Sequence, residues 1–66
     1  MGDSTVGIRF GPRPHIFGPP GTVLAGLVVI AAPDGQPKQR WRVRDVERRS
    51  CSSGLPVDVG WLAEDP

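Results

Sequence analysis

Hydrophobic and polar side chains alternate along several short stretches of this chain, which is the pattern of strands with one covered face. The alternation predicts strands at residues 5–10, 38–44 and 55–62. Residues 22–31 form a continuous apolar run rich in valine and isoleucine, which also favours a strand. No window combines a helical period with caps at both ends. The pattern therefore predicts an all-β chain.

Proline and glycine mark the connections between these strands. Residues 11–21, "GPRPHIFGPPG", are predicted to form a long loop anchored on the core by Ile16 and Phe17, unless a further strand lies near Ile16. The stretch "APDGQP" suits a type I turn within a hairpin, and "ERRSCSSG" is polar and turn-forming.

Four or five short antiparallel strands fit a small, partly open barrel or a twisted meander with a long Pro/Gly-rich loop after the first strand. We expect a single domain over residues 1–66, with tails at 1–4 and 63–66. One core is predicted to contain both tryptophans and the apolar residues of the alternating strands: Trp41, Trp61, Val6, Ile8, Val43 and Val59.

The stretches "GTVLAGLVV", "RWRVRD" and "VDVGWLAE" stand where SH3-like barrels carry their central and last strands, so the chain resembles these domains in pattern. The resemblance implies an accessory subunit of a larger assembly, a role that such barrels have in the heads and head-tail junctions of tailed bacteriophages. The sequence departs from peptide-binding SH3 domains, because it has no tyrosine and no acidic run before Asp58.

A chain of 66 residues buries only a marginal core. Its single cysteine excludes an internal disulfide, and one cysteine with one histidine cannot complete a tetrahedral zinc site. We therefore expect a protein partner or a homo-oligomer to supplement the core, with no metal and no cofactor. The apolar run at 22–32 is too short for a membrane helix. No signal peptide is recognised, so the expected location is the cytoplasm, or the virion if the chain is phage-encoded.

The motif "GPPGT" at residues 18–22 resembles the start of a phosphate-binding loop of AAA-type ATPases. Val23, Leu24 and Ala25 stand where that loop needs its second glycine, its lysine and its hydroxyl. No group is then left to bind phosphate or Mg²⁺. We therefore expect a Pro/Gly turn and no nucleotide.

The residues available for catalysis are few. His15 is the only imidazole and has no nearby acid in sequence to orient it. Cys51 is preceded by two arginines that could lower the pKa of its thiol, but it is interpreted as a small loop residue. Asp45 and Glu47 are interpreted as solvated carboxylates. The sequence predicts a non-enzyme.

The strand at 38–44 places Arg40, Arg42 and Arg44 on one face, opposite Trp41. Their spacing of about 6.6 Å is similar to that of phosphates along a nucleic-acid strand. A plain solvated face is the simplest interpretation, followed by an acidic protein partner and then by nucleic acid. Residues 38–49 are basic overall and 58–66 acidic, an asymmetry that would favour head-to-tail association or steering of a charged partner.

The strand at 22–31 is apolar on both faces, which so small a chain cannot easily bury. Either Gly26 bends the strand so that it serves two sheets, or Leu24, Val28 and Ile30 form an exposed stripe at an interface. We hypothesise a non-catalytic interaction module that docks into a larger protein assembly. Its partner-binding residues are Leu24, Val28, Ile30, Arg40, Arg42 and Arg44. The alternative is a nucleic-acid-binding or regulatory domain that uses the basic strand 38–49.

Overall fold

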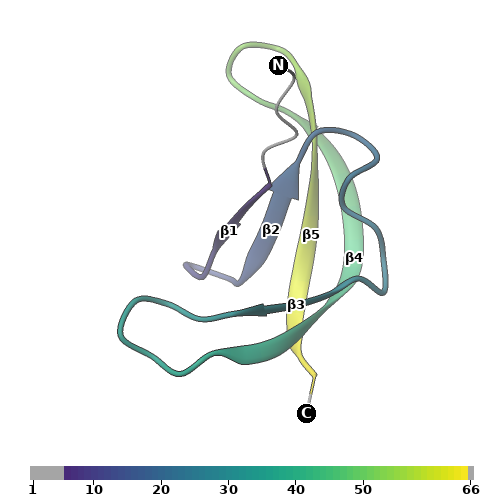
Figure 1. Cartoon of the computed structure of the whole chain (residues 1–66). Coiled ribbons are helices and arrows are strands. Elements are labelled where there is room, and N and C mark those ends of the chain that lie inside the picture. Colours follow the sequence, from purple (N-terminus) through teal and green to yellow (C-terminus); the bar gives the residue numbers. More distant parts are fainter. Residues whose placement is uncertain (1–5, 66) are drawn as a thin grey trace.

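The computed structural model describes residues 6–65 and contains one antiparallel sheet of five strands. The strands are β1 (Gly7–Arg9), β2 (His15–Gly18), β3 (Val28–Ala31), β4 (Gln39–Ser50) and β5 (Pro56–Glu64). Their order is β1-β2-β5-β4-β3, and the sheet curls into a half-barrel (Figure 1). The predicted all-β class is confirmed, with five strands. Within the described part no helix is able to span a membrane.

Each edge strand of the sheet is joined to its neighbour by a hairpin, β1 to β2 and β3 to β4. Both hairpins include residues that the sequence assigned to a loop or a turn. β2 lies inside the predicted loop 11–21 and pairs with β1, so the further strand near Ile16 exists. Between β3 and β4 a turn is present, but the amide of Gln36 donates to the carbonyl of Pro33 over 3.1 Å, so the turn begins one residue later than predicted. Gly35, at its third position, has a φ of 81°, so the turn is not of the predicted type I. These two hairpins place β1 and β3 at the free edges of the sheet.

The strand predicted at 22–31 is present only from Val28 to Ala31. The preceding residues form a loop, because Gly26 has a φ of 89° and the amide of Leu27 turns back to the carbonyl of Leu24 over 3.1 Å. The amide of Gly26 donates to the carbonyl of Val43 over 2.9 Å, which fixes this loop on β4. A mid-strand bend at Gly26 is therefore the wrong explanation of the apolar run.

β4 is longer than predicted and extends through residues 47–50, which the sequence assigned to a turn. The register against β5 shifts between Val43 and Asp45, so that Arg44 occupies a β-bulge. Beyond the bulge, pairing with β5 continues to Ser50, and the turn follows at residues 51–55. Cross-strand contacts between polar side chains keep this segment extended.

The core lies on the concave face of the half-barrel. Its buried members are Ile16, Val23, Val43 and Leu62, with Ile8, Val29 and Trp41 packed against them. The ring of Phe10, after β1, lies 5.8 Å from that of Trp41 on β4, which brings the two ends of the curled sheet together. Val6 was predicted to belong to this core but is 41% exposed.

Trp61 and Val59 lie on the opposite face of the sheet from that cluster, contrary to the prediction of one shared core, although Val59 is itself buried (8% exposed). Asp58, Gly60 and Leu62 face the cluster instead, so the alternate residues of β5 lie on the convex face. Gly60 leaves the space that the side chains of Val23 and Val43 fill: a Cβ atom at position 60 would lie 2.6 Å and 2.8 Å from their methyl groups.

Asp58 fastens the loop before β3 to the sheet. Its carboxylate accepts a hydrogen bond from the amide of Gly21 (3.0 Å) and one from Nε of Arg48 (2.9 Å). The Arg48 guanidinium, followed by the Gly21 amide, holds the pKa of Asp58 below its ordinary value, and the Asp58 contact raises the pKa of Arg48. A charge buried on the concave face is therefore fully partnered, and the loop carries Val23 into the core.

This arrangement predicts a loss of stability in acid. Because the pKa of Asp58 is lower in the folded chain than in the unfolded chain, its contribution is fully present above the unfolded value of about 3.9 and is lost as the pH falls through the folded value. We expect the free energy of unfolding, measured by urea titration across this range, to fall more steeply for the natural chain than for Asp58→Asn. Identical slopes would contradict this role for Asp58.

Candidate functional site

The partner-binding residues that the sequence pointed to lie together at the β3 edge of the sheet. Ile30 pairs with Arg40 and Val28 with Arg42, so these four side chains share the convex face. Val28 is 40% exposed and Ile30 60% exposed. Leu24 and Leu27, in the loop before β3, are also exposed. Leu27 lies opposite Val43 and alternates with Val28, so it is on the concave side of the sheet. We call the remaining surface the β3 face: Leu24, Val28, Ile30, Arg40 and Arg42.

The charges of the β3 face are partly balanced within the chain. Nη2 of Arg42 lies 3.1 Å from the carboxylate of Asp65, just beyond the end of β5. The amide of Asp65 donates to the carbonyl of Arg40 over 2.9 Å. Together with the Arg48–Asp58 pair, these contacts join the basic strand to the acidic end of the chain. Two of the basic side chains are therefore paired with acidic residues within the chain, whereas no ion pair involves Lys38, Arg40 or Arg44 among the described residues. Head-to-tail association by charge stays a prediction.

Arg44 does not belong to a regular ladder with Arg40 and Arg42. It occupies the bulge between Val43 and Asp45, where the alternation of faces is interrupted. The predicted row of three equally spaced guanidinium groups is therefore wrong at its third position. Arg44 is exposed at the side of the β3 face.

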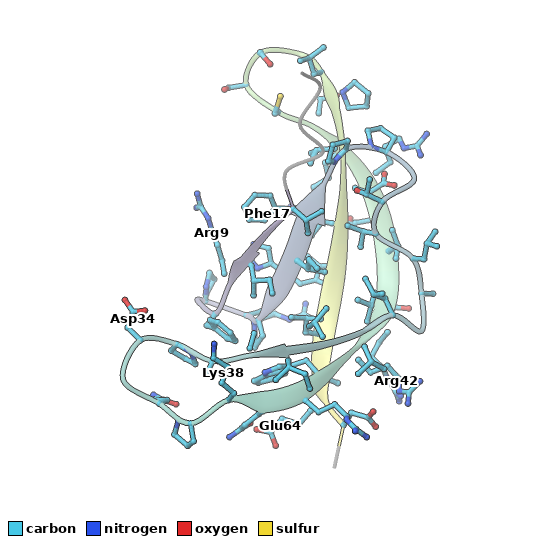
Figure 2. The ribbon with its side chains drawn as sticks, viewed as in Figure 1. Arg9, Phe17, Asp34, Lys38, Arg42 and Glu64 are labelled. Carbon is cyan, nitrogen blue, oxygen red and sulfur yellow. The ribbon has the colours of Figure 1, made fainter. Side chains whose placement is uncertain are left out.

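A second surface, which sequence reasoning missed, lies on the convex face of the other half of the sheet. It is a groove of about 480 Å³ to which β1, β2, β4 and β5 all contribute. Figure 2 shows Arg9 and Phe17 projecting there from β1 and β2, while Arg42 points away at the far side of the sheet. We call it the arginine groove, and its lining residues include Arg9, Arg13, His15, Phe17, Arg49 and Trp61.

Arginine side chains cover the aromatic rings of this groove. The guanidinium of Arg13 lies 4.4 Å from the centre of the Trp61 ring, and that of Arg49 lies 5.5 Å from it. The guanidinium of Arg9 lies 5.5 Å from the centre of the Phe17 ring. His15 stands between the two rings, with its ring centre 5.4 Å from that of Trp61 and 6.0 Å from that of Phe17. These cation–π and ring contacts hold flexible side chains in place.

Glu47 fixes the orientation of Trp61. Nε1 of Trp61 donates to the Glu47 carboxylate over 2.7 Å, and Nη2 of Arg49 lies 3.2 Å from the same oxygen. The Trp61 hydrogen bond, followed by that of Arg49, lowers the pKa of Glu47. The Glu47 carboxylate is therefore ionised at neutral pH, and its hydrogen bonds go to Trp61 and Arg49 of the groove.

The residues considered for catalysis have structural contacts. Nδ1–H of His15 donates to the carbonyl of Arg13 over 2.7 Å, and Cys51 lies at the rim of the arginine groove. A hydrogen bond with Ser53 lowers the pKa of the Cys51 thiol. In the "GPPGT" segment, the amide of Gly21 is bound to Asp58 and the hydroxyl of Thr22 to the carbonyl of Pro19. Among residues 6–65 no cluster of potential metal ligands is present.

The arginine groove could not be read from the sequence, because its members come from four strands that are distant along the chain. A signal for it did exist in the alternation of Gly7, Arg9, His15 and Phe17, which share the face opposite Ile8 and Ile16. A scan against protein-family models gave no match, and searches of curated proteins and of solved structures found no significant similarity. The geometry alone therefore supports the proposals below.

Proposed function

We propose that this chain is a non-catalytic interaction module that assembles through its β3 face. The partner that binds this face is a second copy of the chain, so that the module is a homodimer. The observation that carries the proposal is the exposure of large apolar side chains at one edge of the sheet: Leu24, Val28 and Ile30. Contiguous apolar surface on a small domain is a common mark of an interface.

The small core explains why such an interface would be favourable. Among the described residues the buried hydrophobic side chains are few: Ile16, Val23, Val43, Val59 and Leu62. A domain of this size without disulfide or metal gains stability when a partner covers apolar surface. Full burial of each large side chain contributes about 1.5 to 3 kcal/mol relative to its exposed state.

The polar rim of the β3 face suits a second copy. Arg42 and Asp65 place opposite charges side by side, with Arg40 next to them. In a two-fold dimer the same surface meets itself, so a surface that carries both signs can place the arginine of one copy near the carboxylate of the other. A surface of one sign would repel its copy.

The half-barrel is compatible with the SH3-like architecture that the sequence resembles, and we propose that class for the fold. A role in a larger assembly, such as a virion, would follow if the dimer is the building unit of that assembly. The free edge strand β3 offers a further point of contact, because a strand from another chain can pair with such an edge.

The test is the change Val28→Asp. A carboxylate in the middle of an apolar interface loses its hydration without gaining a partner, so we expect the variant to be a monomer that keeps the natural β-sheet spectrum. The measurement is molar mass by light scattering across a range of concentrations, with far-UV circular dichroism. Val46→Asp is the matched control, because Val46 on β4 is similarly exposed (36%) and lies outside the β3 face.

Three outcomes would contradict this account. If the natural chain is a monomer at about 100 µM, a second copy is not the occupant, and a different protein becomes the candidate. If Val28→Asp remains a dimer, the β3 face is not the interface. If Val46→Asp dissociates equally well, any added charge disrupts the dimer and the assignment to the β3 face fails.

A further inference from the structure

The arginine groove is net positive, because its three arginines outnumber the one carboxylate that is bound to its side chains, that of Glu47. Arg9 and Arg13 form no ion pair with any carboxylate among residues 6–65, and of the three arginines only Arg49 contacts one, Glu47. Each guanidinium is instead held close to an aromatic ring. Side chains fixed in this way lose less conformational freedom when an anion binds.

The floor of the same groove is apolar and aromatic. The rings of Phe17 and Trp61 are partly exposed and are flanked by Val57 and Val59. The guanidinium of Arg13 lies over Trp61 and that of Arg9 over Phe17, so these cations lie between the rings and a ligand. Bases of single-stranded nucleic acids stack on arginine planes as well as on aromatic rings.

The span of the groove sets the size of the ligand. Arg9 stands on β1 and Arg49 on β4, with β2 and β5 between them. Three strand spacings correspond to about 14 Å. Four-stranded sheets that bind RNA stack about two to three bases on their aromatic residues. The groove therefore fits a short single-stranded segment that crosses the strands.

Other ligands satisfy only part of this chemistry. An acidic peptide supplies carboxylates for the guanidinium groups but no flat ring for the floor. A proline-rich peptide supplies apolar rings but no negative charge. Duplex DNA supplies phosphates but keeps its bases stacked inside. Only a ligand with both an anionic backbone and accessible rings uses every element of the groove.

We propose that the arginine groove binds single-stranded nucleic acid, with phosphates on Arg9, Arg13 and Arg49 and with bases stacked on the guanidinium groups that cover Phe17 and Trp61. This site is separate from the β3 face and does not depend on assembly through it. It also differs from the basic strand that the sequence indicated: of residues 38–49, only Arg49 is shared.

The test compares two variants that remove the same charge. Arg9 and Arg13 are changed to Gln in one, and Lys38 and Arg44 in the other; all four are exposed and form no ion pair among the described residues. The probe is fluorescein-labelled oligothymidylate or oligouridylate of about ten residues, titrated at about 50 mM salt and above. We expect the groove variant to lose affinity at least about tenfold and its salt slope to flatten by about 1.4, with little change in the other variant.

Tryptophan emission locates the ligand independently. Trp61 lies in the groove, whereas Trp41 packs against the core on the other face. We expect oligonucleotide binding to change the emission of Trp41→Phe but not that of Trp61→Phe. Far-UV circular dichroism checks that each variant is folded.

The proposal is overturned if both double variants lose affinity equally, since general charge would then account for binding. It is also overturned if the oligonucleotides do not bind at low salt, or if a duplex of the same length binds as tightly. Binding of a polyglutamate peptide in place of the oligonucleotides would assign the groove to an acidic protein.

Discussion

Trp41→Ala is expected to unfold the isolated chain. The Trp41 ring packs against the core and against Phe10, and its Nε1 donates to the carbonyl of Ala31 over 3.0 Å. Its removal takes away the contact that joins the two ends of the curled sheet. Truncation of a tryptophan in a core costs about 3 to 5 kcal/mol, which is comparable with the whole stability of so small a domain. Thermal unfolding followed by circular dichroism measures the loss.

Trp61→Ala is the matched control for this change. Trp61 lies on the convex face, where it contacts Glu47, His15 and arginine side chains and leaves the core untouched. Loss of these contacts should cost about 1 to 2 kcal/mol, so the variant is expected to stay folded at low temperature. If Trp61→Ala unfolds the chain while Trp41→Ala does not, the two faces have been assigned the wrong way round.

Gly60→Ala is expected to destabilise the chain through its core. The added methyl group would lie 2.6 Å from a methyl of Val23 and 2.8 Å from one of Val43, and 3.1 Å from one of Ile16. Real carbon atoms do not approach so closely, so β5 or the loop that carries Val23 must shift. Overpacking of this kind costs about 1 to 3 kcal/mol. Urea titration gives the free energy of unfolding.

Gly11→Ala separates this effect from the general effect of replacing glycine. No atom lies within 4 Å of a Cβ atom built at position 11, and its φ is not positive. We expect its stability to equal or slightly exceed that of the natural chain, because alanine restricts the unfolded state. Equal losses at positions 11 and 60 would contradict close packing at Gly60.

The class of the fold could be predicted from the sequence because it depends on local patterns. Alternation over residues 38–44 and the turn at Pro33 are each set by neighbouring residues, and both are present in the structure. Exposure of Val28 and Ile30 also follows from a local excess of apolar side chains in a small chain. Whether these side chains bind a partner remains a prediction.

The faces of β5 could not be predicted in the same way. If the apolar residues of an alternating strand face the core, Val57, Val59 and Trp61 should do so, but the side chain of Asp58 faces the core instead. Asp58 can do so because Arg48 and the amide of Gly21 satisfy its carboxylate, and these partners are distant in sequence. The bulge at Arg44 likewise depends on how β4 pairs with β5. Tertiary contacts therefore determine which side chains of β5 face the core and where β4 carries its bulge, and the local sequence pattern does not.

The same contacts explain why the arginine groove was missed. Once β5 turns Trp61 to the convex face, β2 adds Phe17 and His15 beside it and β4 adds Arg49. Both proposed surfaces consequently lie on the convex face, the β3 face at one end and the arginine groove at the other. A dimer formed through β3 would leave both grooves open, and two linked sites would raise the avidity for a long single strand.

The central claim, assembly through the β3 face, is tested most directly on the natural chain by hydrogen exchange at high and low protein concentration. We expect slower exchange at high concentration to be confined to residues 24–31 and the adjoining part of β4 around 40–42, because those amides become covered in the dimer. The amides of β1 and β2 serve as the internal reference. Exchange that is independent of concentration at residues 24–31, or protection centred on β1 and β2, would contradict the account.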